Sequence, residues 1–344
     1  MAHKILVTGG TGYIGSHTVV ELQKSGFEVI IIDDLSNSRQ QVVTQIEKIT
    51  GIKPDFHKIN LCDHSKLRSF FNSHNDIDGV IHFAALKAVG ESVRFPLIYY
   101  NNNLQALINL LDSLAILRCN NIVFSSSCTV YGEPEKLPVT EESPIIKASS
   151  PYSNTKQICE EIIEDVSRIT PLRSIILRYF NPIGAHESGL IGELPIGKPN
   201  NLVPFITQTA IGKQKTLEVF GNDYNTPDGT CIRDYIHVVD LAQAHVSALQ
   251  RLFNKEHESR VETYNLGTGR GYSVLEVLNT FEKVNNIKVS HTFSQRRPGD
   301  VPAVYANVDK AKTKLKWVAT KSLEEMLSSA WLWEKNLSEG ILRK

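Results

Sequence analysis

The sequence predicts an α/β protein with a doubly wound parallel sheet and a smaller mixed α/β domain. Three observations lead to this fold class. Short apolar runs alternate with helix-like segments through the first half, a glycine-rich turn follows the first apolar run, and the alternation fades after Arg178. Strands that alternate with helices form right-handed βαβ units and a parallel sheet covered on both faces. The length of 344 residues, at about 150 residues per domain, favours two domains.

The expected strands of the first half are short apolar runs. They cover residues 4–8, 28–33, 55–59, 79–83, 121–126 and 173–178. Helical stretches lie between them, and the clearest cover 96–118 and 152–168. This order places the carboxyl ends of all six strands at one edge of the sheet, where such folds bind their ligands.

The second half is less regular. Residues 181–234 are rich in Gly, Pro and Asn around a helix-like stretch at 202–212, and strand-like pieces follow at 235–239 and 263–266. Over 322–333, apolar residues recur at helical spacing, which is typical of a core-facing helix. We expect one domain over 1–180 with returning segments at about 235–266, and a second domain over the rest of 181–344.

Composition excludes several classes of protein. Lys+Arg and Asp+Glu are both 37, whereas a protein that binds nucleic acid through phosphates usually carries a basic excess. No apolar stretch approaches 18 residues, and the N-terminal run is too short for a signal peptide, so neither a membrane partner nor secretion is expected. The five cysteines are scattered without a Cys-x-x-Cys pair, which predicts no metal site and a reducing, cytoplasmic location.

The first motif is a phosphate-binding turn. Gly9, Gly12 and Gly15 follow the first strand and open a helix, at the spacing Gly-x-x-Gly-x-x-Gly. In a Rossmann-type fold such glycines make the tight turn, admit a pyrophosphate to the backbone N–H groups and let helix and strand pack closely. The helix N-terminus adds a partial positive charge. Asp33 ends the second strand, where a carboxylate accepts hydrogen bonds from ribose hydroxyls and repels a 2′-phosphate, so NAD is expected rather than NADP.

A second glycine pattern is not a phosphate loop. Residues 192–198 have P-loop spacing, but Pro199 stands where a magnesium-binding Ser or Thr is needed, and no strand is expected before them.

The second motif provides acid–base chemistry. Ser125, Ser126 and Ser127 close the fifth strand, and Tyr152 and Lys156 share one face of the helix that follows. A lysine ammonium and a nicotinamide cation would both favour the phenolate, lowering the tyrosine pKa from its usual value of about 10. A Tyr-x-x-x-Lys spacing alone is weak evidence, because the chain has 11 tyrosines. Together with the glycine turn and Asp33 it indicates a base that deprotonates a hydroxyl while its carbon gives a hydride to NAD.

These motifs together resemble the extended short-chain dehydrogenase/reductases. Further segments are similar to one branch of them, the UDP-glucose 4-epimerase family. These segments are 82–92, 178–182, 199–202, 220–224, 233–238 and 296–300. The similarity covers about residues 4–335, and the segments that contain Lys87 and Arg233 are the most diagnostic.

The resemblance implies interconversion of UDP-glucose and UDP-galactose by oxidation at C4, rotation of the 4-keto sugar and re-reduction, with NAD kept bound. Tyr152, Lys156 and Ser127 would be catalytic, with Ser127 as a proton relay. Cofactor-binding residues would be Gly9, Gly12, Tyr13, Ile14, Gly15, Asp33, Asn37, Asn60, Leu61, Phe83, Ala84, Lys87, Asn102, Ser125, Tyr152, Lys156 and Tyr179. Substrate-binding residues would be Ser127, Tyr152, Asn181, Asn201, Leu202, Arg233, Arg297, Asp300 and Val304. Relatives pair through the helices at about 96–118 and 152–169, which implies a homodimer.

Two positions depart from the family pattern. Asn60 replaces an acid that contacts the adenine amine, and its side-chain carbonyl can still accept that hydrogen bond. Val304 stands where some bacterial relatives carry a tyrosine that narrows the sugar pocket, so we expect N-acetylated UDP-hexosamines to fit as well. His237 lies in an apolar stretch and is interpreted as structural.

Three alternatives stay open. A nucleotide-sugar 4,6-dehydratase of the same fold needs an Asp-Glu pair after the Ser/Thr of strand five, where Cys128 and Thr129 stand. A 4-epimerase for another sugar, such as UDP-glucuronate, would share most of the motifs. A non-catalytic protein that senses NAD would not need Ser127, Tyr152 and Lys156.

Overall fold

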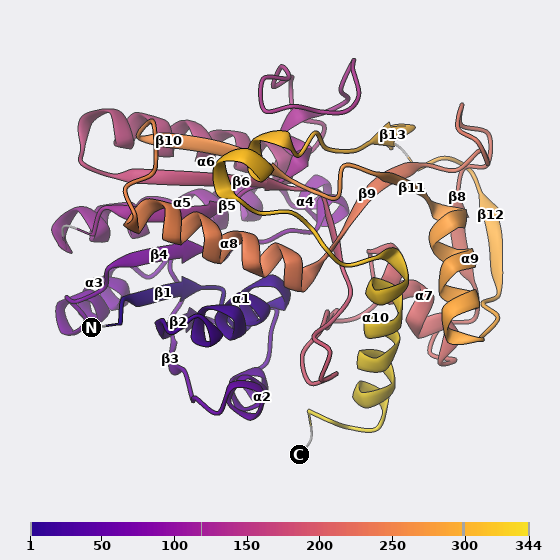
Figure 1. The fold of residues 1–344 in the computed structure, drawn as a ribbon, viewed down its shortest axis with the longest axis horizontal. Helices are drawn as coiled ribbons and strands as arrows, with labels where there is room; N and C mark the ends of the chain where they lie inside the picture. Colours follow the sequence, from indigo (N-terminus) through magenta and orange to yellow (C-terminus); the bar gives the residue numbers. More distant parts are fainter. Residues whose placement is uncertain (1, 118, 298–299, 343–344) are drawn as a thin grey trace.

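The computed structural model describes residues 2–117, 119–297 and 300–342. Two groups of elements lie side by side in Figure 1: a three-layer α/β unit and a smaller mixed unit. The first is built on a seven-stranded parallel sheet, which confirms the predicted fold class. Across this sheet the order is β10 (Val261–Leu266), β6 (Arg173–Tyr179), β5 (Asn121–Ser125), β4 (Gly79–His82), β1 (Lys4–Thr8), β2 (Glu28–Asp33) and β3 (Asp55–Lys58).

Helices cover both faces of this sheet because its strands are apolar on both sides. One face packs against α1 (Tyr13–Lys24), α2 (Gln41–Thr50), α8 (Val238–Phe253) and the short π-helix η2 (Ala311–Leu315). The other face packs against α3 (His64–Ser73), α5 (Pro96–Leu117) and α6 (Pro151–Ile169). Two short helices, α4 (Val89–Arg94) and η1 (Cys128–Tyr131), follow β4 and β5 at the carboxyl edge.

The smaller unit has its own apolar core. Its four-stranded sheet joins β9 (Ile232–His237) to β7 (Asn181–Ile183), β11 (Gly271–Ser273) and β13 (Ala303–Val304). A two-stranded sheet pairs β8 (Leu217–Phe220) with β12 (His291–Ser294). Around them lie α7 (Leu202–Ala210), α9 (Val274–Asn285) and α10 (Leu323–Ser338), which meet in one core (Figure 1).

The segments expected to return to the first domain, at about 235–266, are shared between the two sheets. The prediction of a strand over 235–239 is wrong at its end, because α8 begins at Val238. The ring of His237 caps this helix by accepting a hydrogen bond from the Val239 N–H. The strand itself, β9, pairs within the smaller sheet, whereas α8 and β10 pack with the seven-stranded sheet. We therefore propose a first domain of residues 1–180 with 238–266 and the segment around η2, and a second domain made of the rest.

Most other boundaries lie within a residue or two of the expected ones. The strands expected to end at 59, 83 and 126 each end one residue earlier, and β6 ends one residue later, at Tyr179. The helix expected over 202–212 ends at Ala210, and the last helix continues to Ser338. Residue 118, the expected end of α5, lies outside the described residues. No helix in the described part of the chain is long and apolar enough to cross a membrane.

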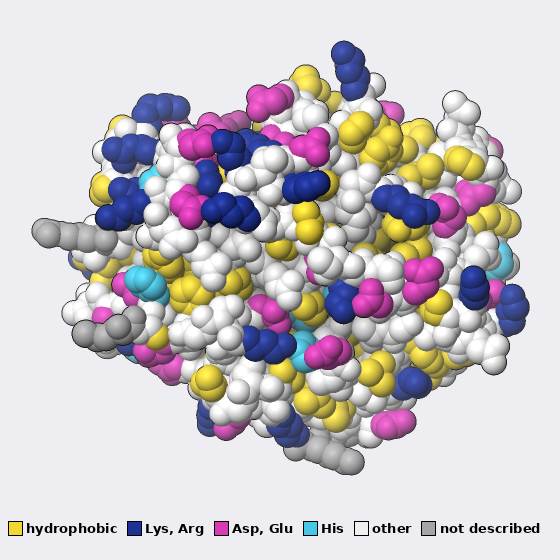
Figure 2. Space-filling view, viewed as in Figure 1, with side chains coloured by type: hydrophobic (Ala, Val, Ile, Leu, Met, Phe, Trp, Pro, Cys, Tyr) yellow, Lys and Arg dark blue, Asp and Glu magenta, His cyan; other side chains and the backbone are white. Residues whose placement is uncertain are grey.

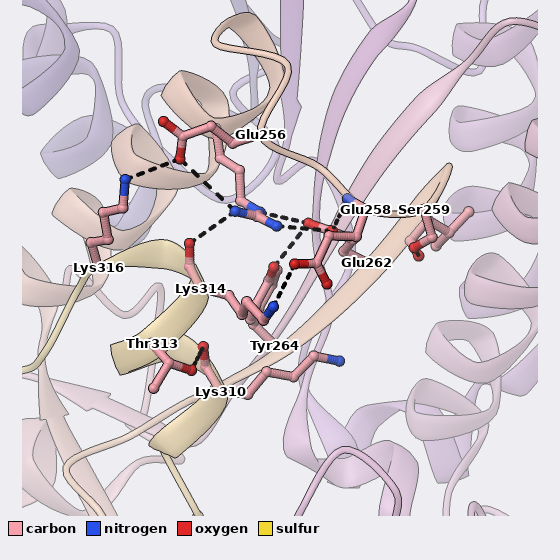
Figure 3. Close-up of polar contacts among 11 residues, drawn as sticks. Glu256, Glu258, Ser259, Glu262, Tyr264, Lys310, Thr313, Lys314 and Lys316 are labelled. Atoms are coloured by element: carbon pink, nitrogen blue, oxygen red, sulfur yellow. Dashed lines mark hydrogen bonds and ion pairs between the residues drawn. The ribbon is translucent and has the colours of Figure 1, made fainter.

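A buried ion pair holds the edge strand β10 to α8. Arg251 on α8 donates to Glu262 on β10 through Nε at 2.7 Å and Nη2 at 3.1 Å, and to the Lys314 carbonyl of η2 at 3.0 Å. The Tyr264 hydroxyl adds a hydrogen bond to Glu262 at 2.8 Å. Figure 3 shows Glu256, Glu262 and Lys314 gathered around this contact. Burial alone would raise the pKa of Glu262, but the hydrogen bonds from Arg251, the Glu258 N–H and Tyr264 lower it to about 2.

We expect Arg251→Leu to lower the free energy of unfolding at pH 7 by about 3 kcal/mol, because Glu262 would keep a buried charge without its cation. The depressed pKa of Glu262 means that its stabilising effect is present above the unfolded-state pKa of about 4.3 and is lost as pH falls towards 2. In the variant, burial without the Arg251 cation raises the pKa of Glu262, so denaturant unfolding at several pH values should show the gap between wild type and variant shrinking steadily from that raised pKa down towards pH 2.

The matched control is Lys316→Met, which removes an exposed ammonium 3.3 Å from Glu256 and should change stability by less than about 0.5 kcal/mol. A gap for Arg251→Leu that stays constant down to pH 3 would contradict the assignment of Glu262.

Candidate active site

The glycine turn between β1 and α1 is built for close approach of an anion. Gly9 has a φ of 71°, and a Cβ there would lie 2.8 Å from the Ala84 nitrogen. A Cβ on Gly15 would lie 2.2 Å from the Gly9 carbonyl oxygen, so helix and turn could not pack as they do. Gly12 caps α1 without a side-chain hydrogen bond, and the first turn of the helix contains no acid. The N-terminal N–H groups of α1 therefore face a space suited to phosphate.

Asp33 joins this turn to the loop after β2. Its carboxylate accepts hydrogen bonds from the Thr11 N–H at 3.2 Å, the Leu35 N–H at 2.9 Å and the Ser38 hydroxyl at 3.0 Å. The side chain is buried, and its partners Thr11 and Ser38 line a hollow together with the exposed Arg39. The acid thus has a fixed orientation toward the place expected for a ribose.

Asn60, the residue expected to contact the adenine amine, already has a hydrogen-bond partner within the protein. The side-chain carbonyl of the exposed Asn60 already accepts a hydrogen bond from the Cys62 N–H at 2.8 Å and forms a turn after β3. A carbonyl oxygen has two lone pairs, so one remains for an adenine amine. The other expected cofactor residues line the same edge: Ile14 on α1, Asn37 after β2, Leu61 after β3, Ala84 after β4 and Asn102 on α5.

The acid–base residues meet where β5 ends. Lys156 on α6 is buried and donates a hydrogen bond from Nζ to the Ser125 carbonyl at 2.7 Å. Burial lowers the pKa of Lys156 to about 8. Burial raises the pKa of Tyr152 well above its usual value, while the Ser127 hydroxyl is the neighbour that lowers it. Without a further positive charge, then, Tyr152 is a neutral phenol beside the hydroxyl of Ser127.

Aromatic rings close the inner end of the site. The Ser125 hydroxyl donates to the Tyr179 hydroxyl at 3.0 Å, so Tyr179 on β6 is held beside the end of β5. The ring of Phe83 packs 4.7 Å from His245 on α8, whose ring centre also lies 6.4 Å from that of Tyr179. His245 was not singled out from the sequence, because nothing local in α8 marks it.

A buried polar network, also missed from the sequence, supports α6. Glu160 lies one helical turn after Lys156 and accepts from Arg178 through Nε at 3.1 Å and Nη2 at 2.6 Å. The Ser126 hydroxyl donates to the same carboxylate at 2.5 Å. Arg178 also donates to the Tyr131 hydroxyl at 2.9 Å, so β5, β6, η1 and α6 share one network.

Glu193 connects the two units across the site. Its side chain accepts hydrogen bonds from Lys87 at 3.3 Å and from Asn201 at 2.7 Å, one an expected cofactor residue and the other an expected substrate residue. Its backbone carbonyl accepts from the Trp333 indole at 2.8 Å. Tyr13 adds a second link, donating from its hydroxyl to the Gly184 carbonyl at 2.6 Å. Glu193 belongs to the segment with P-loop spacing, which lies in the long loop between β7 and α7 and is not followed directly by a helix.

The expected substrate residues gather around β9 and β13. Arg233 donates from Nη1 to the Val301 carbonyl at 2.8 Å, and its Nη2 lies 3.6 Å from Asp300. Val304 pairs with Arg233 in register and is buried. Arg297 is exposed and stacks its guanidinium 4.4 Å over the Phe220 ring. The remaining members are Asn181 at the start of β7, and Asn201 and Leu202 at the start of α7. Pro298 and Gly299 of the same motif lie outside the described residues.

Known proteins share this arrangement. Residues 6–330 match a family model described as GDP-mannose 4,6 dehydratase. A UDP-glucose 4-epimerase from Bacillus subtilis (strain 168) is 50% identical over 337 residues, which cover 98% of each chain. The crystal structure of UDP-glucose 4-epimerase from Stenotrophomonas maltophila with bound NAD and formylated UDP-arabinopyranose superposes with a TM-score of 0.94, at 44% identity over 98% of this chain and 99% of that one. The chain belongs to the UDP-glucose 4-epimerase family.

A second member of the UDP-glucose 4-epimerase family, from Bifidobacterium longum in complex with NAD+ and UDP, gives a TM-score of 0.93 at 44% identity over 98% of this chain and 99% of that one. The residues after β5 distinguish the family from a dehydratase. Elimination needs an acid and a base there, whereas Ser127 is followed by Cys128 and Thr129. Burial raises the pKa of the Cys128 thiol to about 12, so it is no base near neutral pH.

We expect Gly15→Ala to lower the NAD content of the purified protein at least ten-fold, since the new methyl group would push α1 away from the turn. The matched control is Gly90→Ala, where a Cβ meets nothing within 4 Å. The measurement is cofactor per chain after gel filtration, by chromatography of the denatured supernatant. Equal NAD content in the two variants would show that the turn does not hold the pyrophosphate.

Proposed function

We propose that this protein interconverts UDP-glucose and UDP-galactose by oxidising and re-reducing C4 of the sugar with a retained NAD. The observation that carries the proposal is that Ser127, Tyr152 and Lys156 are buried near the carboxyl end of β5, at the same edge of the sheet as the glycine turn after β1. The family's solved members with bound NAD support the cofactor. The arrangement fits this cofactor, because α1 presents an uncapped, acid-free N-terminus to its pyrophosphate.

When bound, NAD supplies the acceptor and donor for the C4 hydride. Tyr152 accepts the C4 hydroxyl proton through Ser127, the neighbouring hydroxyl that lowers its pKa. Because burial disfavours the phenolate, this base needs positive charge nearby. Lys156 has a pKa of about 8, so its ammonium form predominates at neutral pH and lies one helical turn away.

The substrate diphosphate is held at the other end. We assign Arg233 and Arg297 to its oxygens, because a guanidinium fork matches phosphate geometry. The Asp300 carboxylate and two backbone carbonyls orient Arg233 before substrate arrives. Anchored only by its diphosphate, the 4-keto sugar can turn and present its opposite face for re-reduction. The remaining assignments of cofactor and substrate residues follow those given above for the family.

Tyr152→Phe should lower turnover by about 10²–10⁴-fold, since it removes the group that moves the proton. The assay is conversion of UDP-galactose to UDP-glucose by pure protein without added NAD. The matched control, Tyr100→Phe, removes a hydroxyl that accepts a hydrogen bond from Asn154 at 2.7 Å and should leave turnover within a few-fold of wild type. A Tyr152→Phe variant of normal activity and full NAD content would overturn the assignment.

The same assay separates the alternatives. A non-catalytic NAD-sensing protein would bind NAD and the UDP-sugar without converting the sugar. A 4,6-dehydratase would release a 4-keto-6-deoxy sugar nucleotide. An epimerase for UDP-glucuronate would turn over UDP-glucuronate faster than UDP-galactose.

We also propose that N-acetylated UDP-hexosamines are substrates. The observation in favour is the small Val304, placed in register with Arg233. Pure protein should convert UDP-N-acetylglucosamine to UDP-N-acetylgalactosamine, and Val304→Tyr should lower that rate at least ten-fold more than the rate with UDP-galactose. Absence of turnover by the wild type would refute the proposal. Equal loss of both activities would show that the substitution disturbs the buried site as a whole.

A homodimer is our proposal for the assembled state. The helices α5 and α6 pack together, and large apolar side chains on them are exposed: Leu97 79%, Ile98 56%, Ile108 45%, Ile116 55% and Ile169 85%. Large apolar side chains that are exposed along two neighbouring helices are typical of an interface. Light scattering should give twice the chain mass, and Ile108→Glu should weaken the dimer at least ten-fold. Ile52→Glu, at an equally exposed site after α2, is the control. A wild-type monomer at micromolar concentration would contradict the proposal.

We place this activity in the cytoplasm. All five cysteines are free, which suits a reducing compartment.

A further inference from the structure

Two histidines and an aspartate converge at the edge of the large sheet, away from the proposed active site. Asp55 and His57 are two residues apart on β3, so their side chains leave the same face of the strand. His74 is the C-cap residue that directly follows the last residue of α3. One ligand-capable atom from each side chain lies within 4.8 Å of the other two. The three residues thus bring two different elements to one point.

The distances resemble those between the ligands of a metal ion. His57 Nε2 lies 3.1 Å from Asp55 Oδ2, and His74 Nε2 lies 3.9 Å from the same oxygen. In a tetrahedral zinc site with bonds of about 2.0–2.2 Å, neighbouring ligand atoms are about 3.3–3.6 Å apart. His57 Nε2 is buried and makes no hydrogen bond among the described residues, although the oxygen is near enough for one. The pair therefore lacks the geometry of a hydrogen bond.

The tautomer of His74 is also suited to a metal. Its Nδ1 lies 2.9 Å from the Phe70 carbonyl oxygen, which can only accept, and 3.1 Å from the Ser73 hydroxyl, so Nδ1 carries the hydrogen and in the neutral ring Nε2 has the lone pair. The Phe70 ring stacks on His74 with centroids 4.2 Å apart and meets the edge of His57 at 5.0 Å. A carbonyl that fixes the far nitrogen of a histidine ligand is the usual support of such sites.

We propose that Asp55, His57 and His74 bind one divalent transition-metal ion, for which Zn²⁺ is the best match, and that this ion ties β3 to the end of α3. Two imidazoles and one carboxylate favour zinc over calcium or magnesium, which take mainly oxygen ligands. Because β3 is the outer strand of the sheet, a metal there would stabilise an edge that has a partner on one side only. The site is separate from the proposed epimerase chemistry, which uses none of the three proposed metal ligands.

The test uses the purified full chain with its cofactor, treated with a chelator and dialysed against Zn²⁺ or Co²⁺. One ion per chain is expected at this site, with cobalt absorption in the visible range and without a thiolate charge-transfer band. The midpoint of thermal unfolding should rise with zinc. His57→Asn and His74→Gln should each weaken binding at least ten-fold and remove the thermal shift. Asp55→Asn should also weaken binding, and because Asn has the shape of Asp at this exposed position, the fold should not change.

The matched control is His64→Gln, because His64 has a single carboxylate partner, Asp112, at 3.0 Å and no second histidine beside it among the described residues. Its metal affinity should equal that of wild type. Equal affinity in the Asp55, His57 and His74 variants would overturn the site, as would a wild type that binds Mg²⁺ and Zn²⁺ alike or that shows no thermal shift at millimolar zinc.

Discussion

The proposed chemistry depends on one buried ion pair, between Glu160 on α6 and Arg178 on β6. Both side chains are almost wholly buried, and their closest atoms lie 2.6 Å apart. Buried charges are costly unless each finds a partner and hydrogen bonds for its remaining polar atoms. Here the carboxylate also takes the Ser126 hydroxyl, and the guanidinium also reaches Tyr131. The position of α6 relative to the ends of β5 and β6 is thereby fixed.

That constraint places the reactive groups. Lys156 stands one turn before Glu160, and its ammonium reaches back to the Ser125 carbonyl. Tyr152, one turn earlier again, lies beside Ser127. The serines of β5 and the tyrosine–lysine pair of α6 are therefore brought together by a contact that takes no part in proton transfer itself.

The second unit completes the site from the other side. Glu193 accepts from Lys87 of the first unit and from Asn201 of the second, so a single carboxylate is shared by the cofactor side and the substrate side. Basic and acidic side chains are interspersed on the face of the molecule in Figure 2, as the neutral composition suggests. The chain as a whole carries no net charge, so the cations of the proposed function are a local feature within a neutral protein.

Local signals in the sequence were enough for part of this structure. The glycine turn and the Tyr152–Lys156 pair depend on spacing within a few residues, and the strands of the large sheet are short apolar runs between turns. The helix α9 carried an equally local signal, a capping box between Ser273 and Glu276, which was overlooked. At the end of β9 the valines favoured a strand, but capping by His237 started a helix instead.

Contacts between distant parts of the chain left no such signal. Glu193 pairs with Lys87 across 106 residues, and Arg178 reaches Tyr131 across 47. Asp55 and His57 are two residues apart and share one face of β3. His74 joins them only because α3 folds back on the sheet edge. Nothing in the spacing of these residues shows that they meet, since the meeting is set by the order of strands and the length of the helices between them.

The most direct test of the proposed chemistry follows the hydrogen on C4. UDP-galactose deuterated at C4 is given to the pure protein in ordinary water without added NAD, and the UDP-glucose formed is analysed by mass spectrometry and NMR. If the hydride leaves C4 and returns to the opposite face of the same carbon, the product should keep its deuterium at C4. Exchange of that deuterium for solvent hydrogen, or no conversion until NAD is added in stoichiometric amounts, would contradict the proposed chemistry.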